Sequence, residues 1–163
     1  MTRIINTIKL NKKITYLQNL KSLNKESGLI FNSLDNILND FIGHKLFTIL
    51  KFDKINSNLE RVYTSKPREY PLQGKKDVIR NFWQVQVLEM GVEFIGYNSQ
   101  DIKNSFSDFD LIKKLGCSSV LIIPVKSGDN IKGSVNLLHE ESWYSNNHVK
   151  IAQSLVSVIS EAL

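Results

Sequence analysis

The hydrophobic pattern is clearest between Leu115 and Glu140, where two apolar segments flank a short polar one. Alternate positions of an extended strand share one face, and here they read Ser119, Leu121, Ile123, Val125 and then Ile131, Val135, Leu137. Residues 127–130, Ser-Gly-Asp-Asn, are types that tight turns tolerate. Because the two segments are apolar on both faces, they predict a β-hairpin at the centre of a sheet that is covered on each side.

Helical periodicity marks the two ends of the chain. Apolar residues recur at steps of three and four within residues 1–24, within 26–42 and from about residue 147 onward. In the first segment they are Ile4, Ile8, Ile14, Leu17, Leu20 and Leu23. Gly43 follows the second segment, where glycine commonly ends a helix. No proline or long Gly/Ser linker separates the first two helices, so they are expected to form one bent or continuous layer.

A second hairpin is predicted between these ends. Segments 45–52 and 59–65 are rich in β-branched and aromatic residues and flank the polar turn 53–58. Strict alternation in the return strand would put Arg61, Tyr63 and Ser65 on one face. A loop with two prolines then leads to a predicted helix over 77–90, with Asp77 as its N-cap. A short strand at 93–97 and two short helices, 99–106 and 109–115, complete the middle of the chain.

This order of elements predicts an α+β fold. Strands connected as hairpins, with helices at both ends of the chain, form a central antiparallel sheet with the terminal helices on one face. The chain should comprise a basic amphipathic helical arm, residues 1–24, and one globular domain, residues 25–163.

Charge and cysteine content narrow the classes of function. The net charge is +5, but residues 1–25 carry six basic and no acidic side chains, while the remainder carries 15 basic and 16 acidic ones. The basicity therefore belongs to the arm, which makes nucleic acid an unfavoured partner. No apolar run is long enough for a membrane span, and the N-terminus has no secretory-signal pattern. The single cysteine, Cys117, fits a reducing cytoplasm.

The ordered segments resemble the GAF domain, and most of all the small stand-alone bacterial GAF proteins. They read HKLFTILKFD (44–53), RVYTSKPREYPLQGKKD (61–77), FSDFDLIKKLGCSSVLIIPV (106–125) and GSVNLLHE (133–140). The resemblance implies that the terminal helices cover one face of the sheet. A ligand cavity, roofed by the short helices and loops of the middle, would lie on the other face.

By the same resemblance, polar and aromatic side chains of the second hairpin, the middle helices and the central strands would line the cavity. The candidate ligand-binding residues are Arg61, Tyr63, Ser65, Tyr70, Lys76, Trp83, Phe106, Asp108, Ser119 and Asn136. The family often has an asparagine where this chain has Ile122, which leaves Asn136 on the neighbouring strand as the amide candidate.

Several of these residues also have a purely structural interpretation. Tyr63 and Trp83 are residue types that commonly fill a core. An inward-facing Arg61 needs a partner, which is Asp108, another acid or an anionic ligand. Asp108 would equally serve as the N-cap of the helix that follows it.

Catalytic chemistry is not favoured by the sequence. The GAF-fold enzyme free methionine-(R)-sulfoxide reductase forms a sulfenic acid on one cysteine and resolves it with a second, and this chain has Cys117 alone. The spacing of His44, His139 and His148 matches no metal site, and no cofactor is indicated.

Two functions fit these observations. The first is a cytoplasmic sensory GAF protein that binds a small polar or anionic metabolite, and the second is an interaction module whose cavity is filled by its own side chains. Apolar residues on the terminal helices exceed what one sheet face would cover, which predicts a homodimer through that layer. In the last helix they are Val149, Ala152, Leu155, Val156 and Ile159.

Overall fold

The computed structural model describes residues 2–163, with side chains described from residue 6 onward, so Ile4 of the predicted arm lies outside the described side chains. Six antiparallel strands form one sheet in the order β3-β2-β1-β6-β5-β4. Their bounds are β1 Leu46–Asp53, β2 Asn58–Thr64, β3 Lys76–Asp77, β4 Phe94–Gly96, β5 Ser119–Ser127 and β6 Asn130–His139. The two predicted hairpins, β1–β2 and β5–β6, therefore make the centre of the sheet.

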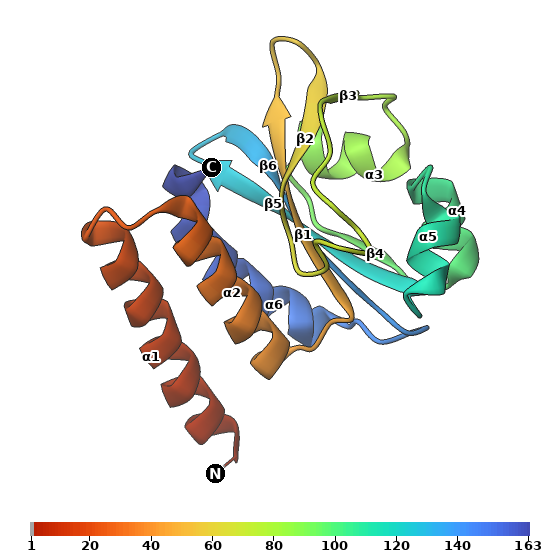
Figure 1. Ribbon diagram of the computed structural model, residues 1–163. Helices are drawn as coiled ribbons and strands as arrows, with labels where there is room; N and C mark the ends of the chain where they lie inside the picture. The colour runs from red at the N-terminus through yellow and green to blue at the C-terminus, as the bar shows by residue number, and fades with distance from the viewer. Residues whose placement is uncertain (1) are drawn as a thin grey trace.

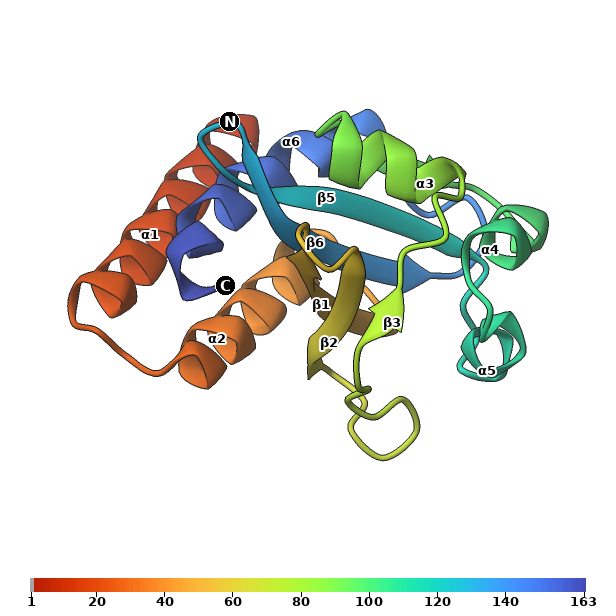
Figure 2. The same ribbon diagram turned by 90° about the horizontal axis from the view of Figure 1, so that it is seen from above.

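Helices lie on both sides of the sheet, as Figures 1 and 2 show. One side carries α1 Thr2–Ser22, α2 Ser27–Phe41, α6 Asn146–Val156 and the 3₁₀ helix η2 Ser157–Ala162. The other carries α3 Phe82–Gln84, the π-helix η1 Val85–Glu89, α4 Ser99–Ser105 and α5 Phe109–Lys114. The predicted α+β architecture with the terminal helices on one face is confirmed.

The N-terminal arm is a separate helix rather than a continuation of α2. The chain turns between them, and Asn24 there adopts a left-handed conformation with φ of 50°. Figure 1 shows α1 and α2 running side by side. Leu17 and Leu20 of α1 are buried in the core beneath the helices, whereas Ile8 and Leu23 are 52% and 67% exposed. The domain thus covers some of the arm's apolar side chains and leaves others exposed.

Two hydrophobic cores lie on opposite faces of the sheet. Alternate residues of β5 enter one or the other, so Leu121 joins the core beneath α2 and α6, and Ile122 joins the core beneath α3, α4 and α5. Both side chains are fully buried. This two-sided burial explains why the strand is apolar at nearly every position.

The helix predicted over residues 77–90 is shorter than expected. Lys76 and Asp77 extend the sheet by pairing with β2, so the helical segment begins only at Phe82. Asn81, not Asp77, is its N-cap. The Asn81 side chain accepts a hydrogen bond from Gln84 N at 3.1 Å, and the Gln84 side chain accepts one from Asn81 N at 3.3 Å. This reciprocal pair is a capping box.

An irregularity in β2 reverses the expected position of Tyr63. The register between β1 and β2 shifts so that Leu50 is opposite Arg61 whereas Ile49 is opposite Tyr63. Val62 is therefore an extra residue, and the strand bulges there. Arg61 and Tyr63 face opposite sides of the sheet, and the prediction that they share a face was wrong.

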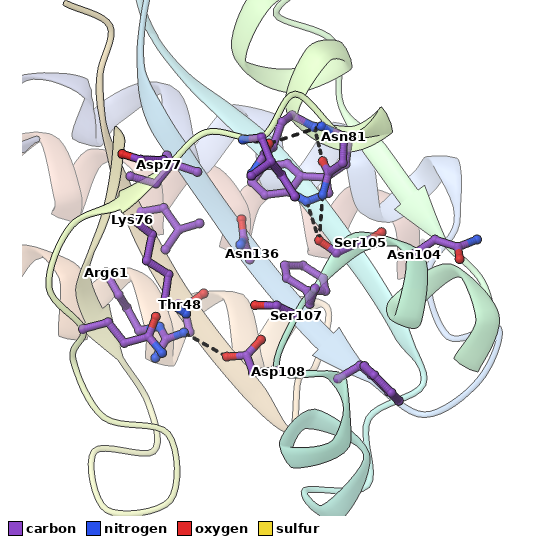
Figure 3. Close-up of a pocket in the computed structure, with 18 of the residues that line it drawn as sticks. Thr48, Arg61, Lys76, Asp77, Asn81, Asn104, Ser105, Ser107, Asp108 and Asn136 are labelled. Carbon is purple, nitrogen blue, oxygen red and sulfur yellow. Dashed lines mark hydrogen bonds and ion pairs between the residues drawn. The ribbon is translucent and has the colours of Figure 1, made fainter. Parts of the chain in front are cut away.

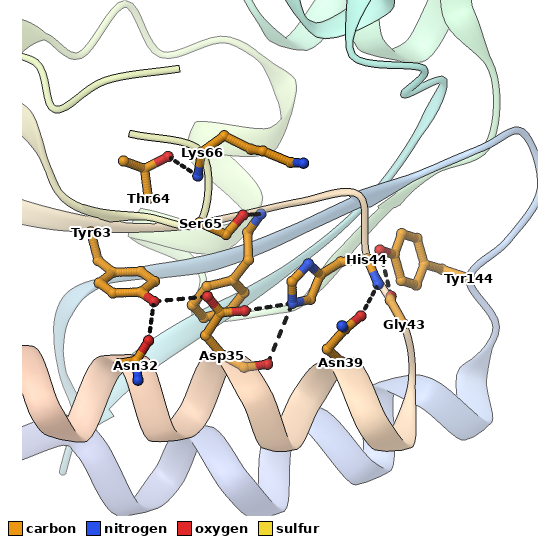
Figure 4. A network of polar contacts seen from close by, with 11 residues as sticks. Asn32, Asp35, Asn39, Gly43, His44, Tyr63, Thr64, Ser65, Lys66 and Tyr144 are labelled. Carbon is orange, nitrogen blue, oxygen red and sulfur yellow. Dashed lines mark hydrogen bonds and ion pairs between the residues drawn. The ribbon is translucent and has the colours of Figure 1, made fainter. Parts of the chain in front are cut away.

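The Tyr63 side chain belongs to a polar network between β2 and α2 (Figure 4). Its hydroxyl donates to Asp35 Oδ2 at 2.8 Å, and the other carboxylate oxygen of Asp35 lies 2.7 Å from His44 Nε2. Ser65, expected beside Tyr63 in the cavity, instead accepts a hydrogen bond from Phe47 N at 2.9 Å. The Tyr63 side chain therefore attaches β2 to α2, and the Ser65 side chain joins the end of β2 to β1.

Candidate functional site

A cavity of about 490 Å³ lies between the sheet and the short helices α3, α4 and α5. Figure 3 shows its residues converging from β1, β2, β6 and the segments that cover them. Its walls combine aromatic, aliphatic and charged side chains, a composition common in small-molecule sites. They are Thr48, Leu50, Leu59, Arg61, Tyr70, Gln73, Lys76, Asp77, Ile79, Asn81, Trp83, Gln84, Lys103, Asn104, Ser105, Phe106, Ser107, Asp108, Phe109 and Asn136.

Seven of the ten candidate residues line this cavity. They are Arg61, Tyr70, Lys76, Trp83, Phe106, Asp108 and Asn136. Tyr63 and Ser65 lie on the α2 side of the sheet, because they follow the bulge at Val62. Ser119 also lies outside the cavity, because its fully buried hydroxyl donates to the backbone oxygen of Glu140 at 2.6 Å.

Arg61 is the charged group buried most deeply in the cavity wall, at 7% exposure. Its Nη1 donates to the backbone oxygen of Pro71 at 2.6 Å, and the guanidinium carbon lies 3.7 Å from the centre of the Tyr70 ring. Its Nη2 lies 3.5 Å from Asp108 Oδ2, the outer limit of a hydrogen bond. Its Nε is buried and has no hydrogen-bond partner among the described residues.

Burial shifts the pKa values of Arg61 and Tyr70 in the cavity wall. Desolvation lowers the pKa of Arg61, while the neighbouring Tyr70 phenol and Asp108 carboxylate act in the opposite direction. Burial, followed by the negative charge of Asp108, raises the pKa of Tyr70 above its ordinary value. The phenol of Tyr70 therefore stays neutral, and the formal charges here are those of Arg61 and Asp108.

The cavity floor is formed by opposed residues of two central strands. Thr48 of β1 pairs with Asn136 of β6, and both are almost fully buried. The Asn136 side-chain oxygen accepts a hydrogen bond from Ser134 Oγ at 2.8 Å, which assigns the amide nitrogen as the group left to donate. Ile122, opposite Asn136 on β5, fills the cavity-side core at the position where the family often has an asparagine.

The roof is a hydrogen-bonded junction between α3 and the end of α4. Asn81 Nδ2 and Trp83 Nε1 both donate to the backbone oxygen of Ser105, at 3.0 Å and 2.9 Å. The rings of Trp83 and Phe106 lie 5.9 Å apart. The sequence pattern did not predict Thr48, Asn81 or Ser105 as cavity residues. Asn81 could have been found from the Asn-x-x-Gln spacing that begins a helix, whereas Ser105 acts through its backbone and gives no sequence signal.

Asp108 stands at the N-cap of α5 but makes no capping hydrogen bond with its side chain. Its carboxylate turns instead toward Arg61 (Figure 3). The ion pair and the N-cap were alternative interpretations of this residue, and the side-chain geometry favours the ion pair.

Comparison of whole structures identifies the architecture. The GAF domain of the Acinetobacter phosphoenolpyruvate-protein phosphotransferase matches with a TM-score of 0.73 at 12% identity, covering 97% of this chain and 92% of that one. The phycocyanobilin-bound GAF domain of a cyanobacterial phytochrome matches with a TM-score of 0.72 at 14% identity, covering 94% and 92%. The chain has the GAF fold. No family model and no curated protein matches the sequence itself.

One solved structure that this chain resembles is that of an enzyme. The type II free methionine-R-sulfoxide reductase of Thermoplasma acidophilum matches with a TM-score of 0.58 at 8% identity, covering 73% of this chain and 78% of that one. Cys117 is 2% exposed here and does not line the cavity. Burial raises the pKa of its thiol to about 11, which disfavours the nucleophilic thiolate.

Among residues 2–163, no group of three or more His, Cys, Asp or Glu side chains has the geometry to hold a metal ion. None of the described helices has the length and apolar character needed to cross a bilayer.

Proposed function

We propose that this chain is a regulatory GAF protein that binds a small polar or anionic metabolite in the cavity around Arg61. The observation that carries the proposal is the incomplete pairing of this buried guanidinium. A buried charge is costly unless it is paired and hydrogen-bonded. An anionic ligand would supply the missing acceptor and so convert this cost into binding free energy.

The remaining walls of the cavity suit such a ligand. Trp83 and Phe106 provide an aromatic surface, and the Asn136 amide provides a second donor on the floor. A pocket with a mainly apolar lining and a few convergent polar groups is the usual architecture of a small-molecule site. We expect the apolar walls to contribute most of the affinity and the polar groups to set specificity.

Native mass spectrometry of the purified protein tests the proposal. We expect a noncovalent adduct that is released on denaturation, and its mass would identify the metabolite. The matched comparison is between Arg61→Gln, which should lose the adduct, and the exposed-site variant Arg68→Gln, which should retain it. Retention of the same adduct by Arg61→Gln would contradict the assignment of Arg61 as the anchor.

A homodimer through the helical layer is the second part of the proposal. Exposed apolar side chains remain on α1, on the turn that follows it and on α2 after the domain has covered Leu17 and Leu20; they are Ile8, Tyr16, Leu23 and Leu29. Apolar groups of this kind are stabilised when a second surface removes them from water. If no metabolite binds, this surface supports the alternative function, an interaction module.

The oligomer is best tested by point substitutions. Deleting residues 1–24 would remove the fully buried Leu17 and expose the core of the domain, which confounds any loss of dimer. Ile8→Lys and Leu23→Lys instead change exposed positions. We expect each to shift sedimentation velocity from dimer toward monomer, while Ile55→Lys, on the exposed β1–β2 turn, leaves it unchanged. A monomeric wild-type protein at micromolar concentration would contradict the dimer.

A further inference from the structure

The guanidinium of Arg61 has one edge that the domain leaves nearly unused. Pro71 accepts from Nη1, and the Tyr70 ring covers one face of the group. The remaining edge consists of Nε, which has no partner among the described residues, and Nη2, which has the 3.5 Å contact with Asp108. A carboxylate binds such an edge through two parallel hydrogen bonds of about 2.7–2.9 Å.

Asp108 does not complete that pairing, and its backbone position explains why. Its carbonyl oxygen accepts hydrogen bonds from Leu111 N at 3.1 Å and Ile112 N at 3.2 Å, so its main chain forms the first turn of α5. The carboxylate reaches Arg61 from this tethered position with one oxygen only. A carboxylate that is not tethered to α5 has no such restriction and can make both bonds.

We propose that Asp108 is an internal competitor that holds Nη2 at the Nε–Nη2 edge of Arg61, and that the ligand is a small monocarboxylate that displaces it. The inference rests on the proposed function, because it specifies the ligand of the same cavity. Binding exchanges one long ion-pair contact for two short charge-assisted hydrogen bonds. The displaced Asp108 moves away from Arg61 toward solvent, to which it is already partly exposed.

The cavity also defines the rest of the ligand. Its lining contains the cations Arg61, Lys76 and Lys103 and the carboxylates Asp77 and Asp108, a net charge of one positive unit that a single ligand carboxylate neutralises. Tyr70 covers one face of the guanidinium, so the proposed ligand would meet Arg61 through its Nε–Nη2 edge once Asp108 has moved away. We therefore expect a planar carboxylate joined to a flat apolar body that packs beside the aromatic wall.

Displacement of Asp108 gives the site a means of signalling. Asp108 lies in the turn between α4 and α5, and these helices form the side of the cavity away from the helical layer (Figure 1). The ion pair holds this turn to β2, the strand that carries Arg61. Release of the ion pair would change how firmly α5 is attached to the sheet, so ligand binding would be detectable at the surface of the domain.

Phenylacetate and its neutral isostere phenylacetamide are suitable probes, since each presents one ring and one planar head group. Two-dimensional ¹H–¹⁵N NMR of the full chain can follow Arg61 Nε–H and the Trp83 indole N–H. We expect phenylacetate to shift both signals in the wild-type protein and phenylacetamide to leave Arg61 unshifted. In Asp108→Asn, half-saturation by phenylacetate should require about tenfold less probe, because the competing carboxylate is gone.

Asp110→Asn is the matched control, since it removes the same charge from an exposed position two residues away. Its half-saturation should stay within twofold of wild type. Asp108→Ser replaces Asp108→Asn if the latter loses its native circular dichroism spectrum. An unshifted Arg61 signal, or unchanged or weaker binding of phenylacetate by the Asp108 variants, would overturn the inference.

The same titrations separate this inference from the proposed function. If both probes shift Trp83 equally and leave Arg61 unshifted, the cavity binds small molecules but the displacement mechanism is wrong. If neither probe shifts Trp83 or Arg61 in any variant, the inference fails. Should native mass spectrometry also find no adduct, the proposed function fails with it.

Discussion

Replacing Tyr63 with phenylalanine removes one hydroxyl group from the contact between β2 and α2 and leaves the ring in place. The ring packs edge-on against Phe31 and Phe47, with centroids 6.2 Å and 5.7 Å away, so little packing is lost. The hydroxyl donates to Asp35 at 2.8 Å, and a hydrogen bond to a charged group contributes about 1.5–3 kcal/mol. Asp35 keeps its contact with His44, and Tyr63 is only half-buried. We therefore expect a loss of about 1–2 kcal/mol.

Urea denaturation followed by circular dichroism measures this change directly. For a chain of this size the loss corresponds to a decrease in Tm of roughly 2–8 °C. Tyr97→Phe is the control, since Tyr97 is 50% exposed and its replacement should change stability by less than about 0.5 kcal/mol. Ligand binding by Tyr63→Phe should equal that of wild type. A variant with wild-type stability and impaired ligand binding would place Tyr63 in the cavity and refute the bulge-based assignment.

Three further outcomes are expected. Gly133→Ala should destabilise the domain by about 1–3 kcal/mol in urea denaturation, because the added methyl group would collide with the backbone oxygen of Leu50. The control Gly74→Ala has open space around it and should be nearly neutral. Burial and a carboxylate contact raise the pKa of Tyr63, so stability should fall as pH rises above about 10, and Tyr63→Phe should lessen this fall in pH-dependent melting. Cys117→Ser should retain ligand binding, and the wild-type protein should not reduce methionine sulfoxide when thioredoxin is supplied. Reductase turnover by the wild-type protein that is lost in Cys117→Ser would contradict this expectation.

The sequence predicts the fold well where burial is periodic. Residues of β5 such as Leu121 and Ile122 point alternately into the two cores. Since each core is filled by apolar side chains, the apolar pattern predicts both the strand and its central position in the sheet. The position of Arg61 in the cavity also follows from the alternation of β2, because Arg61 precedes the bulge.

The errors have local physical causes. One extra residue, Val62, inverts the face of Tyr63, and no sequence period indicates where a strand will bulge. The helical pattern over 77–90 also fits a strand followed by a shorter helix, and the pairing of Lys76 with Leu59 decides between them. Such pairing depends on residues far apart in the chain, which local propensity does not encode.

The most direct test of the central claim is a thermal-shift screen of metabolites on wild-type protein and Arg61→Gln in parallel. A ligand at 100 times its Kd stabilises the folded state by about 2.7 kcal/mol, which for this chain length raises Tm by roughly 5–10 °C. We predict that at least one carboxylate metabolite produces such a shift in wild type and little or none in Arg61→Gln. A screen in which no polar or anionic metabolite raises the Tm, or in which both proteins respond equally, would contradict a cavity anchored by Arg61.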